Sequence, residues 1–454
     1  MTAAPESSVP FRPRPAAAAA EPARPALSAP ALLAPLLGPP VAIFGGGVSG
    51  QAVRELLGRI GARSEIFDER AGAGAAGRFD RARAALHRLV VFSPGFPVNH
   101  AWLQTARAAG CTCLGELDFA SLFWHGRLVA ITGTNGKTTL TEFLTHALGT
   151  AGEAAFAVGN VGFPFTRLPL QTSAADAVAV CEVSSFQAET LRHFRADATL
   201  WTNFAEDHLE RHAGLEDYFA AKWNLVGHTR AGGVFAGSSV QRFARQSGRW
   251  LPPEACIVTE DAAPDARLGG TPFALYPQHE NFLLALAWWR QTGRAEAALY
   301  AAARTFRLGR HRLALVGELR GVPFWNDSKA TNFHAVEAAL ATFPSPVHLI
   351  LGGKSKGGDL RAFVGRISGK CRHVWLIGET RGPLAALCVA GRIPHTVCAS
   401  LEEAVRGAAS AAQPGEPVVL SPAFASFDMF HGYADRGDQF ERLVADLGAT
   451  SIFQ

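Results

Sequence analysis

The stretch that decides the fold is "AITGTNGKTTLTEFL", residues 130–144. Its apolar start predicts a buried strand, and "KTTLTEFL" has the apolar spacing of a helix. A glycine turn between a strand and a helix directs backbone N–H groups at an anion, and a lysine at the helix start reaches the outer phosphates of a nucleotide. We predict a phosphate loop, although Ile131 stands where the common motif has its first glycine. The loop residues are Gly133, Thr134, Asn135, Gly136, Lys137, Thr138 and Thr139.

The rest of the chain repeats this strand and helix pattern in three units. The first starts near Pro39 with "VAIF", the second contains the phosphate loop, and the third follows "GRHR" with "VHLILGG", "HVWLIGE" and "PVVLSPA". Alternating strands and helices favour parallel sheets covered by helices. We expect an α/β protein of three domains. They are a Rossmann-like N-terminal domain over residues 39–127, a central P-loop ATPase-like doubly wound domain over residues 128–311 and a Rossmann-like C-terminal domain over residues 312–454.

Composition narrows the function classes. Residues 1–38 are dominated by Ala and Pro, which predicts a disordered leader, with a cleaved targeting peptide as the alternative. The net charge of +4 comes without a basic and aromatic patch of the nucleic-acid-binding kind. No run reaches the roughly 18 apolar residues of a membrane span. Seven scattered cysteines do not form a disulfide framework. We expect a cytoplasmic monomer that has no membrane span and does not bind nucleic acid.

The first unit carries a second glycine turn. Gly45, Gly47 and Gly50 spell G-x-G-x-x-G after "VAIF", and Asp68 ends the next predicted strand. This pattern binds the diphosphate of a dinucleotide, with the carboxylate on a ribose hydroxyl. Any nucleotide diphosphate fits the same turn, and close packing of helix against strand also produces it. The pattern alone leaves NAD, another nucleotide and a structural turn open.

A carboxylate and two histidines stand near predicted strand ends in the second unit. Glu182 ends the strand in "VCEVSS", where α/β sheets place their ligands, and suits Mg²⁺ opposite the phosphate loop. His208 and His212 in "NFAEDHLERH" are four residues apart, which suggests zinc. Their spelling H-x-E-x-H is not the zinc-protease motif, however. We therefore favour magnesium over zinc.

Cations in the third unit stand beside turns rich in Gly, Asp or Asn. They are Arg312, Lys329 and Lys356. Phosphoryl transfer needs positive charge around the nucleotide, and a domain that closes over ATP would supply it. Each of the three is also an ordinary surface cation when taken singly.

In combination, these motifs resemble the Mur ligases, the ATP-dependent amide-forming enzymes of peptidoglycan precursor synthesis. The resemblance runs from about residue 40 to the C-terminus. It rests, in order, on "GTNGKTT", "GNVGFP", "EVSSFQAE", "NFAEDHLERH", "AAKWNLV", "HRLALV", "NDSKATN", "LGGKSKGGD" and "SPAFASFDMF…RGDQF". "EVSSFQ", "NDSKATN" and the last stretch are most similar to the members that add D-glutamate. This implies an ADP-forming ligase that joins glutamate to UDP-N-acetylmuramoyl-L-alanine, with ATP and Mg²⁺; the sequence does not decide between D- and L-glutamate.

The resemblance also implies roles for individual residues. The catalytic set would be Lys137, Glu182, His208, Lys222 and Lys329. Beside the phosphate loop, the ATP contacts would be Asn281, Arg312 and Asp327. The UDP-substrate contacts would be Ser49, Asp68, Arg70, Ser93, Gly95 and Asn160. The amino-acid contacts would be Thr331, Lys356, Ser426 and Tyr433. The magnesium ligands would be Thr138, Glu182, His208 and, if its side chain carries a carbamate, Lys222.

The chemistry of such a ligase is consistent with these residues. A carboxylate is a poor acyl donor, so the γ-phosphoryl group is first moved onto it, and the amine then displaces phosphate from the acyl phosphate. Mg²⁺ and Lys137 would offset the repulsion between the anionic reactants. A carbamate on Lys222 requires a neutral amine and therefore a depressed pKa.

One stretch departs from the family pattern, and other functions remain as alternatives. The family's H-N-x-x-N-A appears as "HENFLLALA", so that Glu280 or Leu284 replaces a polar residue near the ATP contacts. The alternatives are a sibling ligase for another amino acid or a folylpolyglutamate-synthase-like enzyme, an NAD-dependent oxidoreductase that uses Gly45 to Asp68, and a catalytically idle nucleotide-binding protein.

Overall fold

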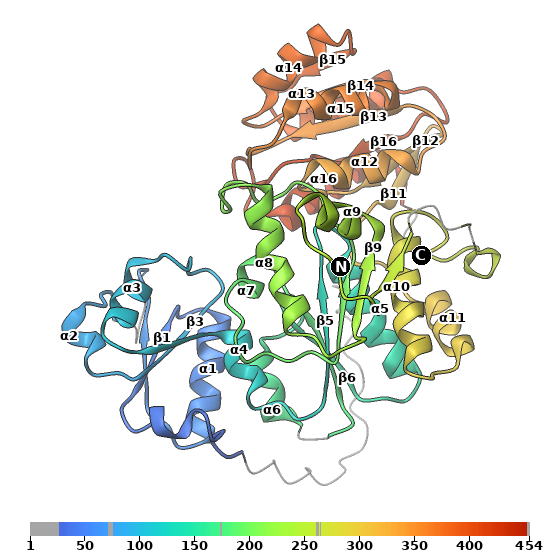
Figure 1. Ribbon diagram of the computed structural model, residues 1–454. Coiled ribbons are helices and arrows are strands. Elements are labelled where there is room, and N and C mark those ends of the chain that lie inside the picture. Colours follow the sequence, from blue (N-terminus) through green and yellow to red (C-terminus); the bar gives the residue numbers. More distant parts are fainter. Residues whose placement is uncertain (1–26, 71–75, 173–174, 260–262, 264, 452–454) are drawn as a thin grey trace, which may run out of the picture.

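The computed structural model describes residues 27–70, 76–172, 175–259, 263 and 265–451. Three sheets with covering helices follow one another along the chain. Figure 1 shows the first sheet, in blue, beside the central sheet, with the third sheet, in orange, above it. The expected α/β fold of three such units is confirmed.

The first sheet is parallel, in the order β2-β1-β3-β4. Its strands are β1 (Val41–Phe44), β2 (Ser64–Phe67), β3 (Leu89–Phe92) and β4 (Thr112–Gly115), and its helices are α1 (Val48–Arg59), α2 (Arg81–Ala84), α3 (Ala101–Ala108) and α4 (Glu116–Ser121). A Cβ atom at Gly50 would lie 1.8 Å from the Gly45 carbonyl oxygen, so helix α1 approaches the end of β1 too closely for any side chain there. Packing alone therefore requires glycine at position 50.

The segment before β1 corrects one expectation. Residues 27–38 include a short 3₁₀ helix, η1 (Ala34–Leu36), and Leu33 is fully buried. Leu27, Leu36 and Leu37 pack against the same apolar cluster of β1, α1 and α4. The prediction of disorder is wrong for this part of the leader, because its leucines bury apolar surface that the Ala and Pro content concealed. Residues 1–26 lie outside the described residues.

The central sheet is also parallel, in the order β10-β9-β8-β5-β7-β6. Its strands are β5 (Arg127–Thr132), β6 (Ala155–Gly159), β7 (Val178–Glu182), β8 (Ala198–Trp201), β9 (Val234–Gly237) and β10 (Cys256–Val258). The helices are α5 (Lys137–Thr150), α6 (Leu168–Gln171), α7 (Ser185–Ala188), α8 (Leu215–Gly227), α9 (Ser238–Gln246), α10 (Gln278–Gln291) and α11 (Glu296–Thr305), with 3₁₀ turns η2 (Phe165–Arg167) and η3 (Ala266–Leu268).

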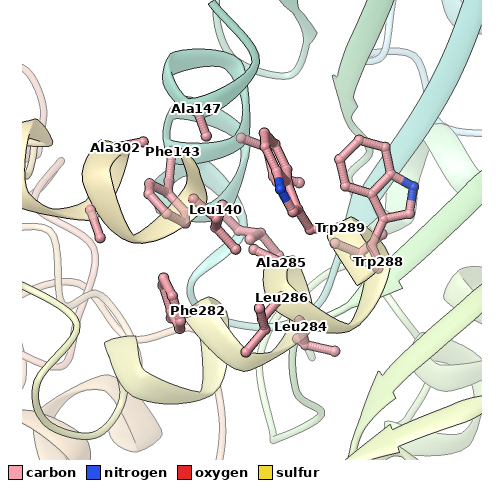
Figure 2. Close-up of a cluster of buried hydrophobic side chains, with 14 of the residues drawn as sticks. Leu140, Phe143, Ala147, Phe282, Leu284, Ala285, Leu286, Trp288, Trp289 and Ala302 are labelled. Atoms are coloured by element: carbon pink, nitrogen blue, oxygen red, sulfur yellow. The ribbon is translucent and has the colours of Figure 1, made fainter. Parts of the chain in front are cut away.

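The core of the central unit holds helix α5 in place. Figure 2 shows α5 and α10 contributing facing side chains, with Phe143 of α5 against Phe282 of α10. Trp289 is fully buried in the same cluster, and so is Leu284 from the altered "HENFLL" stretch. Burying each such side chain stabilises the fold by about 1.5 to 3 kcal/mol. This packing holds strand β5, which precedes the phosphate loop, and helix α5, which follows it, in fixed positions.

The third sheet has the order β15-β14-β13-β16-β12-β11-β17. The strands from β15 to β12 run parallel, whereas β11 pairs antiparallel with β12 and with β17. The strands are β11 (Ala314–Leu319), β12 (Val322–Asn326), β13 (Val347–Gly352), β14 (Cys371–Ile377), β15 (His395–Val397), β16 (Val418–Leu420) and β17 (Thr450–Ser451). The helices are α12 (Phe333–Ala341), α13 (Leu360–Ile367), α14 (Arg381–Ala390), α15 (Leu401–Ala411) and α16 (Tyr433–Asp446), with the 3₁₀ turn η4 (Ser368–Lys370).

Two further observations concern the cysteines and the described helices. Cys111, Cys113, Cys181, Cys256, Cys371, Cys388 and Cys398 are free thiols. Among the helices that the structure describes, none has the length and apolar character needed to cross a bilayer.

Candidate active site

The phosphate loop lies between β5 and α5, as the sequence predicts. Gly133 and Gly136 have φ angles of 145° and 81°, in the region that favours glycine. A Cβ atom at Gly133 would lie 1.9 Å from Thr202 Oγ1, and one at Gly136 would lie 2.7 Å from Asn281 Nδ2. Asn281 therefore lies directly against the loop. Neither glycine can be replaced without moving the loop or its neighbours.

Two lysines meet at one carbonyl of this loop. Lys137 Nζ donates to the Gly133 oxygen at 2.9 Å, and Lys222 Nζ, from α8, donates to the same oxygen at 2.8 Å. Burial lowers the pKa of Lys222 well below its ordinary value, and the neighbouring Lys137 ammonium lowers it further. Burial also lowers the pKa of Lys137, against the opposing effect of Glu182. The site therefore favours the neutral amine of Lys222 that a carbamate would require.

Glu182 ends β7 next to the loop and is 1% exposed. Its Oε1 atom accepts a hydrogen bond of 2.7 Å from Asn160 Nδ2. Its buried Oε2 atom has no hydrogen-bond partner among the described residues. A carboxylate oxygen that is desolvated in this way is suited to a cation.

The two histidines of "NFAEDHLERH" face different partners. His208 Nδ1 lies 3.3 Å from Glu210 Oε1, whereas His212 Nε2 lies 3.0 Å from Ser185 Oγ. Burial lowers the pKa of His208, although Asp207 opposes the shift. Within the described part of the chain, no three His, Cys, Asp or Glu side chains converge to form a metal site.

A cavity of about 480 Å³ lies beside the phosphate loop, between the central and third units. It is lined by loop residues, by the segment before α10 and by α12. The predicted ATP contacts that line it are Asn135, Gly136, Thr139, Asn281, Arg312 and Asp327, together with Lys329. The structure thus brings together residues that are up to 194 positions apart in the chain (329 minus 135).

Two titratable groups in this cavity have shifted pKa values. Burial raises the pKa of Asp327 to about 7, although Ser421 Oγ donates to its Oδ2 atom at 2.7 Å. Burial, and then Arg312, lower the pKa of Lys329 to about 8. Lys329 Nζ lies 3.8 Å from the centroid of the Tyr433 ring. These groups therefore titrate near neutral pH.

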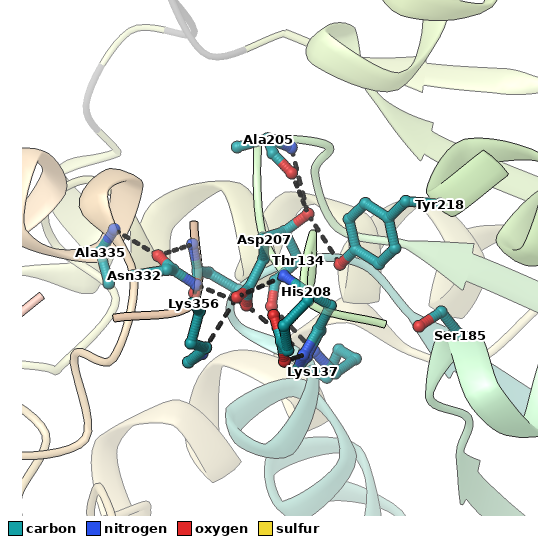
Figure 3. Close-up of polar contacts among 12 residues, drawn as sticks. Thr134, Lys137, Ser185, Ala205, Asp207, His208, Tyr218, Asn332, Ala335 and Lys356 are labelled. Carbon is teal, nitrogen blue, oxygen red and sulfur yellow. Dashed lines mark hydrogen bonds and ion pairs between the residues drawn. The ribbon is translucent and has the colours of Figure 1, made fainter. Parts of the chain in front are cut away.

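A second cavity, of about 360 Å³, collects all four predicted amino-acid contacts. Thr331, Lys356, Ser426 and Tyr433 line it together with His208 and Phe427. Lys356 Nζ forms an ion pair of 3.0 Å with Asp207 Oδ1 of the central unit. Figure 3 shows Asp207, His208 and Lys356 close together, with Lys137 nearby. This cavity presents a cation and a hydroxyl, groups that suit a carboxylate.

Comparison with known proteins agrees with this geometry. Residues 131–249 match the Mur ligase middle domain, and residues 311–424 match the Mur ligase, glutamate ligase domain. The UDP-N-acetylmuramoylalanine–D-glutamate ligase of Gloeobacter violaceus is 37% identical over 442 residues, which cover 90% of this chain and 99% of that protein. The protein of the same name from Solibacter usitatus is 38% identical over 378 residues, 79% of this chain and 85% of that one.

The chain belongs to the Mur ligase family. The MurF ligase from Thermotoga maritima, solved in complex with ADP, has the same fold, with a TM-score of 0.54 and 15% identity over 80% of this chain and 99% of that one. The prediction of a Mur ligase from the sequence motifs is confirmed.

In this Mur ligase the backbone of the glycine turn in the first unit donates a hydrogen bond to the carboxylate of Asp68, which belongs to the same unit. Asp68 Oδ2 accepts a hydrogen bond of 2.6 Å from Gly46 N, and Asp68 Oδ1 accepts one from Arg70 N. The bond from Gly46 is the main cause that lowers the pKa of Asp68. Ser93 is close to the turn, because a Cβ atom at Gly45 would lie 2.7 Å from Ser93 Oγ.

The predicted UDP-substrate residues fall in two places. Ser49, in the first turn of α1, and Gly95, after β3, lie at the same strand ends as Asp68, Arg70 and Ser93. Asn160 lies elsewhere, in the central unit beside Glu182. Thr138 stands in the first turn of α5, half-buried. The roles of these residues stay predictions.

Residues not singled out from the sequence connect the parts of the site. Asp207 accepts from Lys356 and Asn332, and together with His208 these contacts outweigh burial, so that its pKa lies below the ordinary value. Arg436 is fully buried and donates to Ser328 and Phe424, which fixes the chain beside Lys329. Asp207, Asn332 and Arg436 lie in the motifs "NFAEDHLERH", "NDSKATN" and "RGDQF", respectively. No local sequence pattern predicts their long-range contacts.

Proposed function

We propose that this Mur ligase joins D-glutamate to UDP-N-acetylmuramoyl-L-alanine and converts ATP to ADP and phosphate, in peptidoglycan precursor synthesis. The observation that carries the proposal is that one cavity is lined by the phosphate loop and a second cavity by Thr331, Lys356, Ser426 and Tyr433. The relatives at 37% and 38% identity support the choice of substrates.

The first step moves a phosphoryl group. A carboxylate oxygen of the UDP-substrate attacks the γ-phosphorus of ATP, and ADP leaves. Lys137, at the start of α5, and Lys329 and Arg312, in the cavity, supply positive charge around the transferring group. Desolvation makes these interactions stronger than they would be in water.

Mg²⁺ fits the residues that surround the loop. Glu182 Oε2 is a buried carboxylate oxygen without a hydrogen-bond partner among the described residues. Thr138 adds a hydroxyl at the helix start, and His208 and a carbamate on Lys222 would complete the protein ligands. Bound Mg²⁺ would neutralise phosphate charge.

The second step forms the amide. The amine of D-glutamate attacks the acyl phosphate, phosphate leaves and the amine loses a proton. Lys356 and Ser426, which line the cavity of about 360 Å³, would hold the carboxylates of the amino acid. Tyr433, whose ring contacts Lys329 Nζ, joins the two cavities.

We also infer a cytoplasmic, monomeric enzyme. Free thiols persist in a reducing compartment, and ATP and a UDP-linked substrate are cytoplasmic metabolites.

The test is phosphate release by the purified chain with ATP, Mg²⁺ and UDP-N-acetylmuramoyl-L-alanine against a panel of D- and L-amino acids, with mass spectrometry of the product. Release that depends on D-glutamate, with a product heavier by one glutamyl residue, supports the proposal. Release with another amino acid only, or none while ATP still binds, refutes it. A melting-temperature shift with NADH and none with UDP would favour the oxidoreductase alternative.

A further inference from the structure

The side chain of Asn135 points away from its own loop. The central unit fixes the Asn135 backbone, because Asn135 N donates to Asn203 Oδ1 at 2.9 Å and Thr202 Oγ1 donates to Asn135 O at 2.6 Å. The Asn135 amide group instead contacts Asn332 and His334 of the third unit. A residue expected to bind nucleotide therefore spans two units of the chain.

Asn332 uses its full hydrogen-bonding capacity at this junction. Its Nδ2 atom donates to Asn135 Oδ1 at 3.0 Å and to Asp207 Oδ2 at 2.9 Å. Its Oδ1 atom accepts from Asn135 Nδ2 at 3.2 Å and from Ala335 N at 2.9 Å, the latter bond capping helix α12. The side chain is buried, and Figure 3 shows its amide between Ala335 and Asp207. Two donors and two accepted bonds satisfy the whole amide group.

His334 continues the junction along the nucleotide cavity. Its Nδ1 atom lies 2.9 Å from Asn135 Nδ2, and its Nε2 atom lies 3.3 Å from the Tyr276 hydroxyl. Because the amide nitrogen of Asn135 can only donate, His334 Nδ1 must accept and the proton must lie on Nε2. His334 and Tyr276 both line the cavity of about 480 Å³.

We propose that Asn135, Asn332 and His334 form an amide latch that holds the third unit closed on the phosphate loop, with Asn135 acting as a positioning residue through its side chain. The inference rests on the proposed function, because its kinetic effect concerns the glutamate and ATP sites. In the closed arrangement Thr331, which precedes Asn332 in the chain, lies against the central unit. Lys356 also lies against that unit. The latch thereby assembles the amino-acid cavity beside the loop.

Neutral groups suit this position. The reciprocal amide bonds between Asn135 and Asn332 add no charge to a junction that already holds the ion pair of Lys356 with Asp207. Such bonds also require a fixed orientation of both amides, so they define one closed arrangement of the two units.

The sharpest perturbation is Asn332→Asp. Aspartate accepts from Ala335 N and caps a helix as well as asparagine does, so α12 keeps its start. It loses both donors, however, and sets a carboxylate against Asp207 Oδ2 and Asn135 Oδ1. At roughly tenfold for each lost hydrogen bond, kcat/KM for glutamate should fall about a hundredfold. Affinity for the UDP-substrate, held by the first unit, should change less than about twofold.

The experiment combines kinetics with small-angle X-ray scattering of the full chain. The latch predicts a larger radius of gyration for Asn332→Asp than for wild type, at an unchanged helix content. His395→Ala, on the far strand β15, is the matched control and should change neither quantity. An Asn332→Asp variant with the wild-type radius and wild-type kcat/KM would overturn the proposal.

Two further results keep the outcome decisive. If Asn332→Asp does not fold, His334→Ala at a half-buried position must show the same expansion and loss. Asn135→Ala and His334→Ala should also be non-additive in a double-mutant cycle, and strict additivity would overturn the latch. If wild type does not form the D-glutamate product, the proposed function fails, but the scattering comparison still tests the latch.

Discussion

Replacing Asp327 by asparagine should stabilise the protein, and the gain should grow with pH. Asp327 is 8% exposed, and burial raises its pKa from an ordinary value of 3.8 to about 7. An acid with a raised folded-state pKa binds more protons when folded than when unfolded. Its contribution to stability is therefore fully present below pH 3.8 and is lost as the pH rises through about 7.

The size of the effect follows from the same pKa. At about 1.4 kcal/mol per pH unit, the difference between 3.8 and about 7 corresponds to about 4 kcal/mol at high pH. Between about pH 5 and pH 8, wild type should lose about 3 kcal/mol of unfolding free energy relative to Asp327→Asn. The asparagine keeps an oxygen for Leu313 N, which donates to Asp327 Oδ1 at 3.1 Å. Ser421 can turn its hydroxyl to accept from the new amide.

The assay is urea unfolding of both proteins at about pH 5 and about pH 8, compared as the difference between variant and wild type. Taking the difference removes the contribution of all other titrating groups. ADP release, measured in parallel, should fall in Asp327→Asn, because the residue lies among the predicted ATP contacts. A stability difference that is the same at both pH values, or that favours wild type at pH 8, would refute the reasoning.

The other predictions concern the phosphate loop and its surroundings. Lys137→Ala should lower ADP release by about a thousandfold or more and leave UDP-substrate binding within a few-fold in calorimetry. Normal turnover would remove Lys137 from the phosphate site. Lys222→Ala should lose most activity and regain part of it with added short carboxylates, which would replace the carbamate; no rescue would count against that group. Glu182→Gln should raise the Mg²⁺ concentration for half-maximal rate at least about tenfold, and an unchanged Mg²⁺ curve would exclude Glu182 as a ligand.

Local pattern was sufficient for much of the fold. Buried strands such as "VAIF" and "VHLILGG" are short apolar runs next to glycine turns, and they appear as β1 and β13. Some strands were not predicted, among them β9, β10 and β11, although "VFAG" of β9 is itself a short buried run next to glycines. Strand β11 is only partly buried and pairs antiparallel with β12 at the side of a mostly parallel sheet, so its structure depends on β12 rather than on its own composition.

The site was predictable where a motif carries the chemistry and unpredictable where contacts are long-range. Lys137 and Glu182 follow from strand and helix boundaries. The contact of Lys222 with the Gly133 carbonyl spans 89 residues, and that of Asn135 with Asn332 spans 197. Such distances in sequence carry no local signal, so the contact of the Asn135 side chain with the third unit could not be predicted.

The lowered pKa of Lys222 and the Glu182 oxygen that has no hydrogen-bond partner among the described residues belong to one buried cluster beside the phosphate loop. Lys137 and Lys222 both donate to the Gly133 carbonyl, and Lys137 also donates to the Thr134 carbonyl, so the two side-chain nitrogens lie close together in a desolvated site that disfavours two positive charges. Carbamylation of the neutral Lys222 amine would prevent its protonation and place a negative group near Glu182, which interacts with Lys222 electrostatically. Two carboxylate-like groups would then face the phosphates, an arrangement that Mg²⁺ stabilises and that no ammonium group could provide. Lys137 would keep its charge for the phosphoryl group. On the proposed function, the same burial that makes this site costly without its substrates would favour binding of the metal together with the nucleotide.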